Sequence, residues 1–155
     1  MTRKILLALA FLGLAALPLE AQDSGLRTIP ATEGFAATLV KLEKAIKSGG
    51  MKVFTHIDHA AAAKEFGLTM PPSTVVIFGN PKSGTPNFLK KPTLAIDLPL
   101  KILVWQDDAG KTFVTYNSGS YVLGTLFERH GLKPPPQIIE EQEKILEGLA
   151  KSAAN

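Results

Sequence analysis

The segment KILVWQDDAGKTFVTY, residues 101–116, decides the fold. Two runs rich in β-branched and aromatic residues, 101–105 and 112–116, flank the turn-forming residues Asp107 to Gly110. Two such runs around a short polar turn predict a β-hairpin. Because the strands of a hairpin are antiparallel, this region favours an antiparallel sheet over the parallel sheet of a Rossmann or barrel fold.

Apolar periodicity places further strands and helices on both sides of the hairpin. Runs with strand character lie at 26–29, 51–57 and 74–78. Helix caps followed by helical spacing predict helices after Thr32, Asp58, Thr85 and Ser118 or Ser120, and a last helix within 133–155. We therefore predict an α+β fold, in which a single layer of about five mostly antiparallel strands packs on helices.

The N-terminus has the pattern of a secretory signal peptide. Arg3 and Lys4 precede an uncharged apolar stretch, residues 5–19, and Ala21 offers a small residue for cleavage. A transmembrane anchor is the alternative, but a bilayer span needs about 20 apolar residues. We expect a signal peptide at 1–21, and a periplasmic or secreted product without a stable membrane span after cleavage.

The remaining chain is interpreted as a folded core, residues 22–132, and a C-terminal helix, residues 133–155. Three prolines, Pro134 to Pro136, form a stiff break near the start of the second part. An amphipathic pattern follows them, and the helix can either cover the core or reach toward a partner.

Composition excludes several classes of function. The chain has no cysteine, which removes thiol catalysis, zinc–thiolate sites and iron–sulfur clusters. Its 17 basic and 14 acidic residues are nearly balanced, so nucleic acid is not an expected partner. No dinucleotide fingerprint occurs, and we predict no cofactor.

A glycine-containing loop follows the run at 74–78. Gly79 and Gly84 have the spacing of a phosphate-binding P-loop, but Thr85 stands where that motif needs lysine. The loop is therefore not a P-loop. Two interpretations remain: a pair of turns in which Thr85 caps a helix, or an anion site formed by Lys82 and the start of that helix.

Two histidines raise the question of a metal site. His56 and His59 are three residues apart, but Asp58 between them is predicted to be the N-cap of a helix that begins at His59. Structural and catalytic metal sites need more ligands than this segment supplies. We predict no metal site and retain metal handling only as a lesser alternative.

Asp97 is a candidate acid or base. It is the only charged residue in TLAIDLPL, residues 93–100, and apolar surroundings can prepare a carboxyl group for proton transfer. Alternatively, Asp97 accepts backbone N–H groups in the turn before Pro99. His130 has a simpler explanation, because a helix C-terminus attracts positive charge.

Several of these segments together resemble the family named domain of unknown function 302. The resemblance covers about residues 35–132 and depends on four markers: Ile57-Asp58-His59, Phe78-Gly79-Asn80-Pro81, Gly84-Thr85-Pro86 and Asp97-Leu98-Pro99-Leu100. It implies a compact α+β domain, for which a TATA-box-binding-protein-like arrangement is one option. It implies no activity.

The leading hypothesis is an exported, non-enzymatic domain that binds a small polar ligand or anion, or pairs with itself as a homodimer. The alternative is a small enzyme that uses His59 and Asp97 as acid and base. The predicted ligand-binding residues lie at strand ends and are expected to meet at one edge of the sheet: Asp58, His59, Asn80, Lys82, Gly84, Thr85 and Asp97.

Overall fold

The computed structural model describes residues 23–155, so the predicted signal peptide at 1–21 lies outside the described residues. Five antiparallel strands form one open sheet in the order β1-β5-β4-β3-β2. The strands are β1 (Leu26–Pro30), β2 (Lys52–Asp58), β3 (Ser73–Gly79), β4 (Leu100–Gln106) and β5 (Thr112–Asn117). The predicted α+β fold with a single antiparallel sheet is confirmed.

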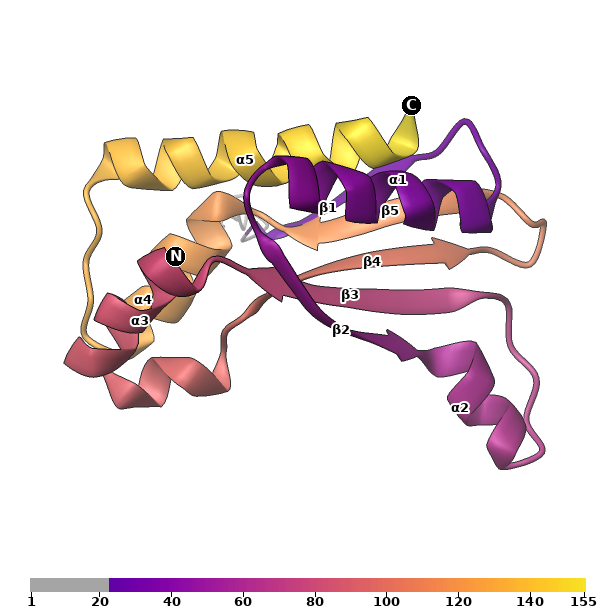
Figure 1. Ribbon diagram of the computed structural model, residues 1–155, viewed down its shortest axis with the longest axis horizontal. Coiled ribbons are helices and arrows are strands. Elements are labelled where there is room, and N and C mark those ends of the chain that lie inside the picture. The colour runs from indigo at the N-terminus through magenta and orange to yellow at the C-terminus, as the bar shows by residue number, and fades with distance from the viewer. Residues whose placement is uncertain (1–22) are drawn as a thin grey trace, which may run out of the picture.

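The helices cover one face and both ends of this sheet. They are α1 (Phe35–Ser48), α2 (His59–Glu65), α3 (Pro81–Lys90), the 3-10 helix η1 (Pro92–Ile96), the π-helix η2 (Ser120–Leu126), α4 (Phe127–Arg129) and α5 (Pro136–Ala154). α1 and α5 run side by side over the same face, while α2 and α3 extend from opposite ends (Figure 1). Within residues 23–155, no helix combines the length and the apolar character of a membrane span.

The core lies between the sheet and the pair α1 and α5. Alternate strand positions and one side of each helix supply its apolar side chains, among them Leu42, Ile46, Val76, Phe78, Ile102, Val104, Val114 and Leu146. This alternation is what a sheet with one covered face requires. Full burial of such a side chain contributes roughly 1.5–3 kcal/mol, so the two layers stabilise each other.

The β4–β5 hairpin forms where the sequence predicts it. Val104 pairs with Val114, and the strands continue to the turn. There the N–H of Lys111 donates to Asp107 Oδ1 at 2.8 Å, and Gly110 has a φ angle of 78°. This left-handed conformation carries no steric penalty for glycine, which explains why a glycine occupies position 110 of the turn.

Helix α5 covers the core and does not reach away from it. Its Ala150 is fully buried, and the N–H of Thr32 donates to the carbonyl of Ala154 at 2.8 Å. The prediction that Thr32 caps α1 is wrong, because Gly34 occupies the N-cap position. Thr32 Oγ1 instead donates to the same Ala154 carbonyl at 3.0 Å, which joins the start of α1 to the end of α5.

Helix α3 begins five residues earlier than the sequence predicts. Asn80 is its N-cap, with Oδ1 accepting from the N–H of Lys82 at 3.0 Å, and Pro81 occupies the first helical position. Proline suits that position because its missing N–H would have no helical partner. Thr85 and Pro86 therefore lie inside the helix, and the predicted Thr85 cap is wrong.

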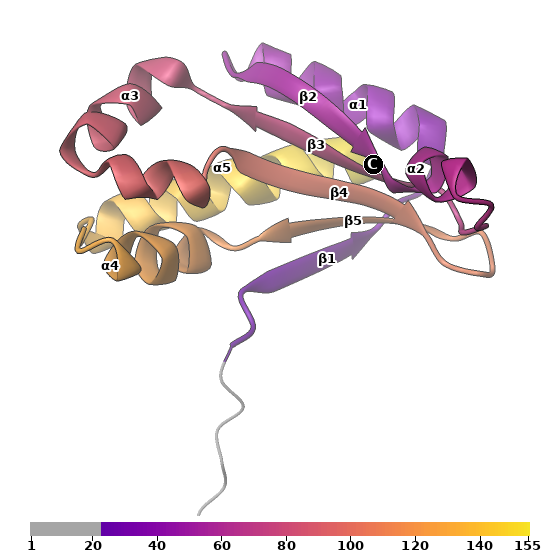
Figure 2. The same cartoon turned by 90° about the horizontal axis from the view of Figure 1, so that it is seen from below.

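The second face of the sheet, which we call the open face, carries no helix over its centre among the described residues (Figure 2). Half-buried side chains alternate there with the core positions: Val75, Ile77, Leu103, Trp105, Phe113 and Thr115. The rings of Trp105 and Phe113 stack with centroids 4.8 Å apart, and Trp105 Nε1 donates to Thr115 Oγ1 at 2.9 Å. The open face is thus apolar and internally hydrogen-bonded.

Candidate functional site

The predicted site residues divide between the two ends of the sheet. β2 and β3 are antiparallel, and Asp58 at the end of β2 pairs with Thr74 near the start of β3. Asn80 follows the end of β3, so it lies six residues after Thr74, or roughly 20 Å further along the strand. Asp97 precedes the start of β4, at the same end as Asn80. The structure does not bring Asp58 and His59 to the other residues, and the expected single cleft is not formed.

Asp58 has a structural role at its own end of the sheet. Its Oδ1 accepts a hydrogen bond from the N–H of Ala61 at 2.9 Å, which confirms the predicted N-cap of α2. His59 begins α2 and is exposed, whereas Nε2 of His56 lies 3.2 Å from Oε1 of Glu43 in α1. In residues 23–155, no group of three or more His, Asp or Glu side chains is arranged to hold a metal ion.

The first turn of α3 offers few donors to an anion. Pro81 has no N–H, the N–H of Lys82 is bonded to the Asn80 side chain, and the N–H groups of the following two residues donate to the Asn80 carbonyl. The free N–H groups that make a helix start an anion site are therefore already used. Lys82 and Thr85 are exposed on the outside of this turn.

Asp97 has two side-chain partners that lie far from it in the sequence. Its Oδ2 is 2.6 Å from His130 Nε2, and its Oδ1 is 3.3 Å from a guanidinium nitrogen of Arg129. The other ring nitrogen of His130, Nδ1, lies 2.9 Å from Thr93 Oγ1. The side chains of His130 and Asp97 are 7% and 14% exposed. Asp97 thus joins η1 to the end of α4 through side chains, where the sequence suggested a turn held by backbone N–H groups.

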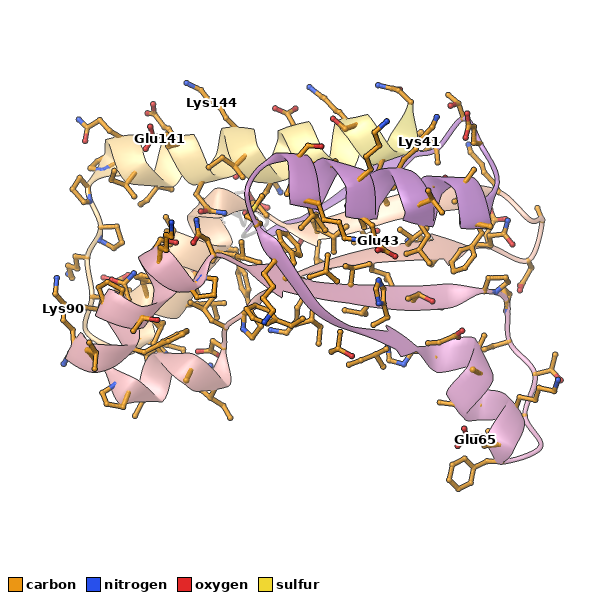
Figure 3. All side chains as sticks on the ribbon, viewed as in Figure 1. Lys41, Glu43, Glu65, Lys90, Glu141 and Lys144 are labelled. Atoms are coloured by element: carbon orange, nitrogen blue, oxygen red, sulfur yellow. The ribbon has the colours of Figure 1, made fainter. Side chains whose placement is uncertain are left out.

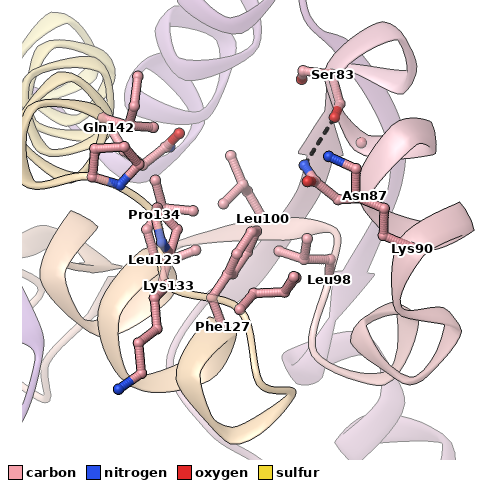
Figure 4. Close-up of a pocket in the computed structure, with 15 residues that line it drawn as sticks. Ser83, Asn87, Lys90, Leu98, Leu100, Leu123, Phe127, Lys133, Pro134 and Gln142 are labelled. Carbon is pink, nitrogen blue, oxygen red and sulfur yellow. Dashed lines mark hydrogen bonds between the residues drawn. The ribbon is translucent and has the colours of Figure 1, made fainter.

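A cavity of about 450 Å³, which we call the α3–α5 cavity, lies beside these residues and is shown in Figure 4. α3 forms one wall, α5 the facing wall, and the η2–α4 segment and the start of β4 lie between them. Its lining is mainly apolar and includes Leu98, Leu100, Leu123, Phe127 and Ile138. Cavities of this volume and composition hold small organic molecules in other proteins.

A second cavity of about 570 Å³ lies between α1 and α5 and meets the first. Both cavities are lined by Ser83, Leu100 and Gln142. The Nε2 atom of Gln142 is buried and has no hydrogen-bond partner, the one such side-chain atom within residues 23–155. Leaving a buried donor unpaired costs about 1–3 kcal/mol. An acceptor atom of a bound molecule would remove this cost.

The α3 wall supplies the remaining polar groups. Ser83, Asn87 and Lys90 recur at helical spacing and lie on the side of α3 that faces the cavity, across from Gln142 (Figure 4). Asn87 Nδ2 donates to the carbonyl of Ser83 at 3.1 Å, which holds the amide in place. Gly84 also lines this wall. The cavity therefore combines an apolar lining with polar groups on two facing helices.

The structure does not assemble the predicted catalytic pair. His59 lies at the opposite end of the sheet from Asp97, and Asp97 lines a hollow of about 10 Å³. The row Thr93, His130 and Asp97 has the composition of a catalytic triad, but none of the three lines the α3–α5 cavity or the cavity beside α1. These three residues connect η1 to the end of α4 through side-chain hydrogen bonds.

The groups with shifted pKa values lie outside the α3–α5 cavity, and Tyr116 and Glu43 are two of them. Burial, reinforced by the nearby negative charges of Glu143 and Glu147, raises the pKa of Tyr116 in β5. The hydrogen bond from Lys47 lowers the pKa of Glu43 in α1. Both shifts arise from packing and pairing in the fold.

Sequence reasoning missed Gln142, Asn87 and Lys90. A signal was available for Gln142, because it lies four residues after Ile138 and four before Leu146 on the apolar side of α5. A polar residue on an apolar stripe is either paired or functional. No comparable signal marks Asn87 or Lys90, since polar residues on an exposed helix are common.

Comparison with known proteins supports the family assignment. A family model described as domain of unknown function DUF302 matches residues 27–152. A protein of Brucella suis biovar 1 named "Fluoride-specific ion channel FluC 1" is 43% identical over 110 residues, which are 71% of this chain and 42% of that protein. A protein of the same name from Brucella abortus biovar 1 is also 43% identical over 110 residues, or 39% of its length. The chain thus spans about two-fifths of the length of these relatives.

A solved structure shows the same fold. The crystal structure of an uncharacterized conserved DUF302 protein from Bacillus stearothermophilus aligns with a TM-score of 0.69 and 20% sequence identity. The alignment covers 84% of this chain and 98% of that one. The family model reaches from β1 almost to the end of α5, and the resemblance predicted from the sequence is confirmed: the protein belongs to the DUF302 family.

Proposed function

We propose that the protein is a non-catalytic binding domain that holds a small organic molecule in the α3–α5 cavity. Gln142 lines the cavity, and the observation that carries this proposal is its buried Nε2 atom, which has no hydrogen-bond partner within residues 23–155. An acceptor oxygen of the ligand would satisfy this donor, and the apolar body of the ligand would contact the surrounding side chains. This differs from the expected strand-end site, because the ligand lies between helices.

The domain is proposed to act in the periplasm or outside the cell, because its N-terminal sequence has the signal-peptide pattern. Two Brucella relatives match 110 residues of this chain and are named as fluoride-specific ion channels. A single fluoride ion would not fill a cavity of about 450 Å³ with an apolar lining. We therefore propose that an organic molecule, and not fluoride, is the ligand.

The test uses two matched glutamine variants of α5. Gln142→Leu removes the unpaired donor and should raise the free energy of unfolding of the ligand-free protein by about 1 kcal/mol. It should also abolish the thermal stabilisation produced by molecules found in a metabolite screen or retained in native mass spectrometry. Gln137→Leu, an exposed change on the same helix, should leave ligand stabilisation intact. If every ligand found stabilises Gln142→Leu as much as the unaltered protein, the cavity is not the site.

Self-association is a second candidate function, favoured by the open face. At the outward positions of the five strands within residues 23–155, the charged residues are Lys52, which pairs with Gly79 at the end of β3, and Lys101, which lies near the same end of the sheet. Lys101 Nζ donates to the carbonyls of Asp97 and Pro99, at the end of the sheet. Two copies could therefore pack their open faces together without bringing like charges into the centre of the interface.

Sedimentation of the purified protein tests this second proposal. We expect a dimer in which Trp105, the single tryptophan, becomes more buried and its fluorescence shifts to shorter wavelength. Leu103→Glu places a charge at the centre of the open face and should yield a monomer. Gln137→Glu on α5 is the matched control and should remain dimeric. A monomer at all concentrations would reject the proposal.

A further inference from the structure

We propose that the molecule bound in the α3–α5 cavity is an amphiphilic carboxylate with an apolar chain, of the fatty-acid class. This inference rests on the proposed function and adds the chemistry of the ligand. Three features of the cavity support it: the sign of its charged residues, the number of ammonium groups that are free to act, and the character of its lining.

The charged residues around the cavity all have the same sign. Lys90 and Lys133 line the α3–α5 cavity, and Lys144 lines the second cavity that meets it. No aspartate or glutamate among residues 23–155 lines either cavity. Because opposite charges attract and the mouth of a cavity concentrates that attraction, an anionic ligand is favoured over a cationic one.

Of these three lysines, Lys90 is best placed to act on a ligand. Lys133 Nζ lies 3.2 Å from Glu128 Oε1, so its charge is already paired. Lys144 extends from α5 on the side away from the sheet (Figure 3). Lys90 has no ion pair within residues 23–155 and lies on the α3 wall beside Asn87.

One available ammonium group indicates a ligand with one negative charge. The N–H groups in the first turn of α3 are already bonded, so they add no donors for a phosphate. A carboxylate carries a single charge and can accept from Gln142 Nε2, while Lys90 on the facing wall balances its charge. A phosphate monoester, with close to two charges, would need more donors than these residues provide.

The lining indicates an apolar chain without further polar groups. Leu98, Leu100, Leu123, Phe127 and Ile138 present only carbon atoms from their side chains. They offer no donor or acceptor for further polar groups on the ligand, so polar substituents would be buried without partners. Each methylene of an alkyl chain would instead gain burial, worth about a fourfold increase in affinity.

Calorimetry with three probes tests the ligand class. Decanoate has the head and the chain, decan-1-ol has a neutral head on the same chain, and acetate has the head alone. At low ionic strength, decanoate should bind at least about tenfold more tightly than decan-1-ol, because its hydrogen bonds are charge-assisted. Octanoate should bind about 16-fold more weakly than decanoate, and acetate should not bind at millimolar concentration. High salt should reduce the ratio of the affinity for decanoate to the affinity for decan-1-ol.

Matched lysine variants identify the charge that matters. Lys90→Gln should weaken decanoate binding about tenfold and leave decan-1-ol binding unchanged. Lys64→Gln removes a lysine from α2 at the opposite end of the sheet and should change neither affinity. If Lys90→Gln binds decan-1-ol as tightly as the unaltered protein does, its weaker binding of decanoate results from the lost charge and not from loss of the fold.

The outcomes separate this inference from the proposed function. Equal affinity for decanoate and decan-1-ol, or an unchanged ratio in Lys90→Gln, overturns the anionic class while the cavity remains a binding site. A Gln142-dependent ligand from the metabolite screen, with no binding of decanoate, overturns the fatty-acid class in the same way. If neither these probes nor any screened molecule binds in a Gln142-dependent manner, both proposals fail.

Discussion

Asp97 Oδ2 lies 2.6 Å from His130 Nε2, although 33 residues separate the two in the chain. The residues next to this pair line the α3–α5 cavity: Leu98 follows Asp97, and Phe127 and Leu132 lie on either side of His130. The contact therefore joins the segment before β4 to the end of α4, and both segments lie between the α3 and α5 walls of the cavity. A side chain that the sequence suggested as an acid or base supports the cavity from outside.

A double-mutant cycle measures this contact. Asp97→Ala should lower the free energy of unfolding by about 1–3 kcal/mol, because His130 is left without its partner in a mostly buried position. His130→Ala should cost a similar amount, and the double variant should cost less than the sum of the two. Urea titration followed by circular dichroism gives the three values. Asp108→Ala, in the exposed hairpin turn, should change stability by less than about 0.5 kcal/mol. Strict additivity of the two changes would show that the pair contributes nothing.

Gly119 determines how closely α5 approaches η2. A Cβ atom at this position would lie 2.5 Å from the backbone nitrogen of Glu143 and 2.8 Å from the carbonyl oxygen of Ile139. Both are backbone atoms of α5, so they cannot rotate away. Gly119→Ala should therefore shift α5 and lower the free energy of unfolding by about 1–3 kcal/mol.

Gly124 is the control for this substitution. It lies in η2, and no atom lies within 4 Å of a Cβ built there. Gly124→Ala should be neutral or stabilising by up to about 1 kcal/mol. Thermal denaturation of the two variants should thus give shifts of different sign or size. Equal destabilisation by both would contradict the close approach of α5 at Gly119.

The Asp58 cap predicts different effects for two substitutions. Asp58→Ala removes the acceptor for the N–H of Ala61 and should cost about 1 kcal/mol. Asp58→Asn keeps a capping oxygen and should retain most of the stability. Guanidinium titration of both variants provides the comparison. A full loss in Asp58→Asn would show that the negative charge, and not the cap, stabilises this end of β2.

The pKa of Tyr116 predicts a loss of stability at alkaline pH. Burial raises the pKa of this phenol above its unfolded value of about 10, so the folded protein keeps a proton that the unfolded chain releases. The contribution of Tyr116 is therefore complete below about pH 10 and decreases as the pH rises above it.

Substitution of Tyr116 isolates this effect. The difference in free energy of unfolding between the unaltered protein and Tyr116→Phe should shrink when the pH is raised from 8 to 10.5. Titrating groups common to both proteins cancel in this difference. An increase in the difference over the same range would contradict the direction of the pKa shift.

Features encoded within a few neighbouring residues could be predicted from the sequence. The hairpin between β4 and β5 depends on two β-branched runs and the turn at Asp107 to Gly110, and it forms as predicted. The Asp58 cap depends on one side chain and an N–H three residues later. Where two local signals competed, the prediction was wrong: Asn80 and Thr85 are both good caps, and the helix begins at the first of them.

The sequence by itself determined the α+β class, the antiparallel hairpin and the family, because each depends on local spacing or on an ordered set of short motifs. Only the tertiary structure decided which residues meet. The antiparallel course of β2 and β3 places His59 and Asn80 at opposite ends, and the docking of α4 beside η1 pairs Asp97 with His130. Docking of α5 against the sheet buries Nε2 of Gln142, a residue of the cavity wall that faces α3. These contacts depend on strand order and helix packing, which arise from the burial of the whole core and leave no periodic mark on the chain.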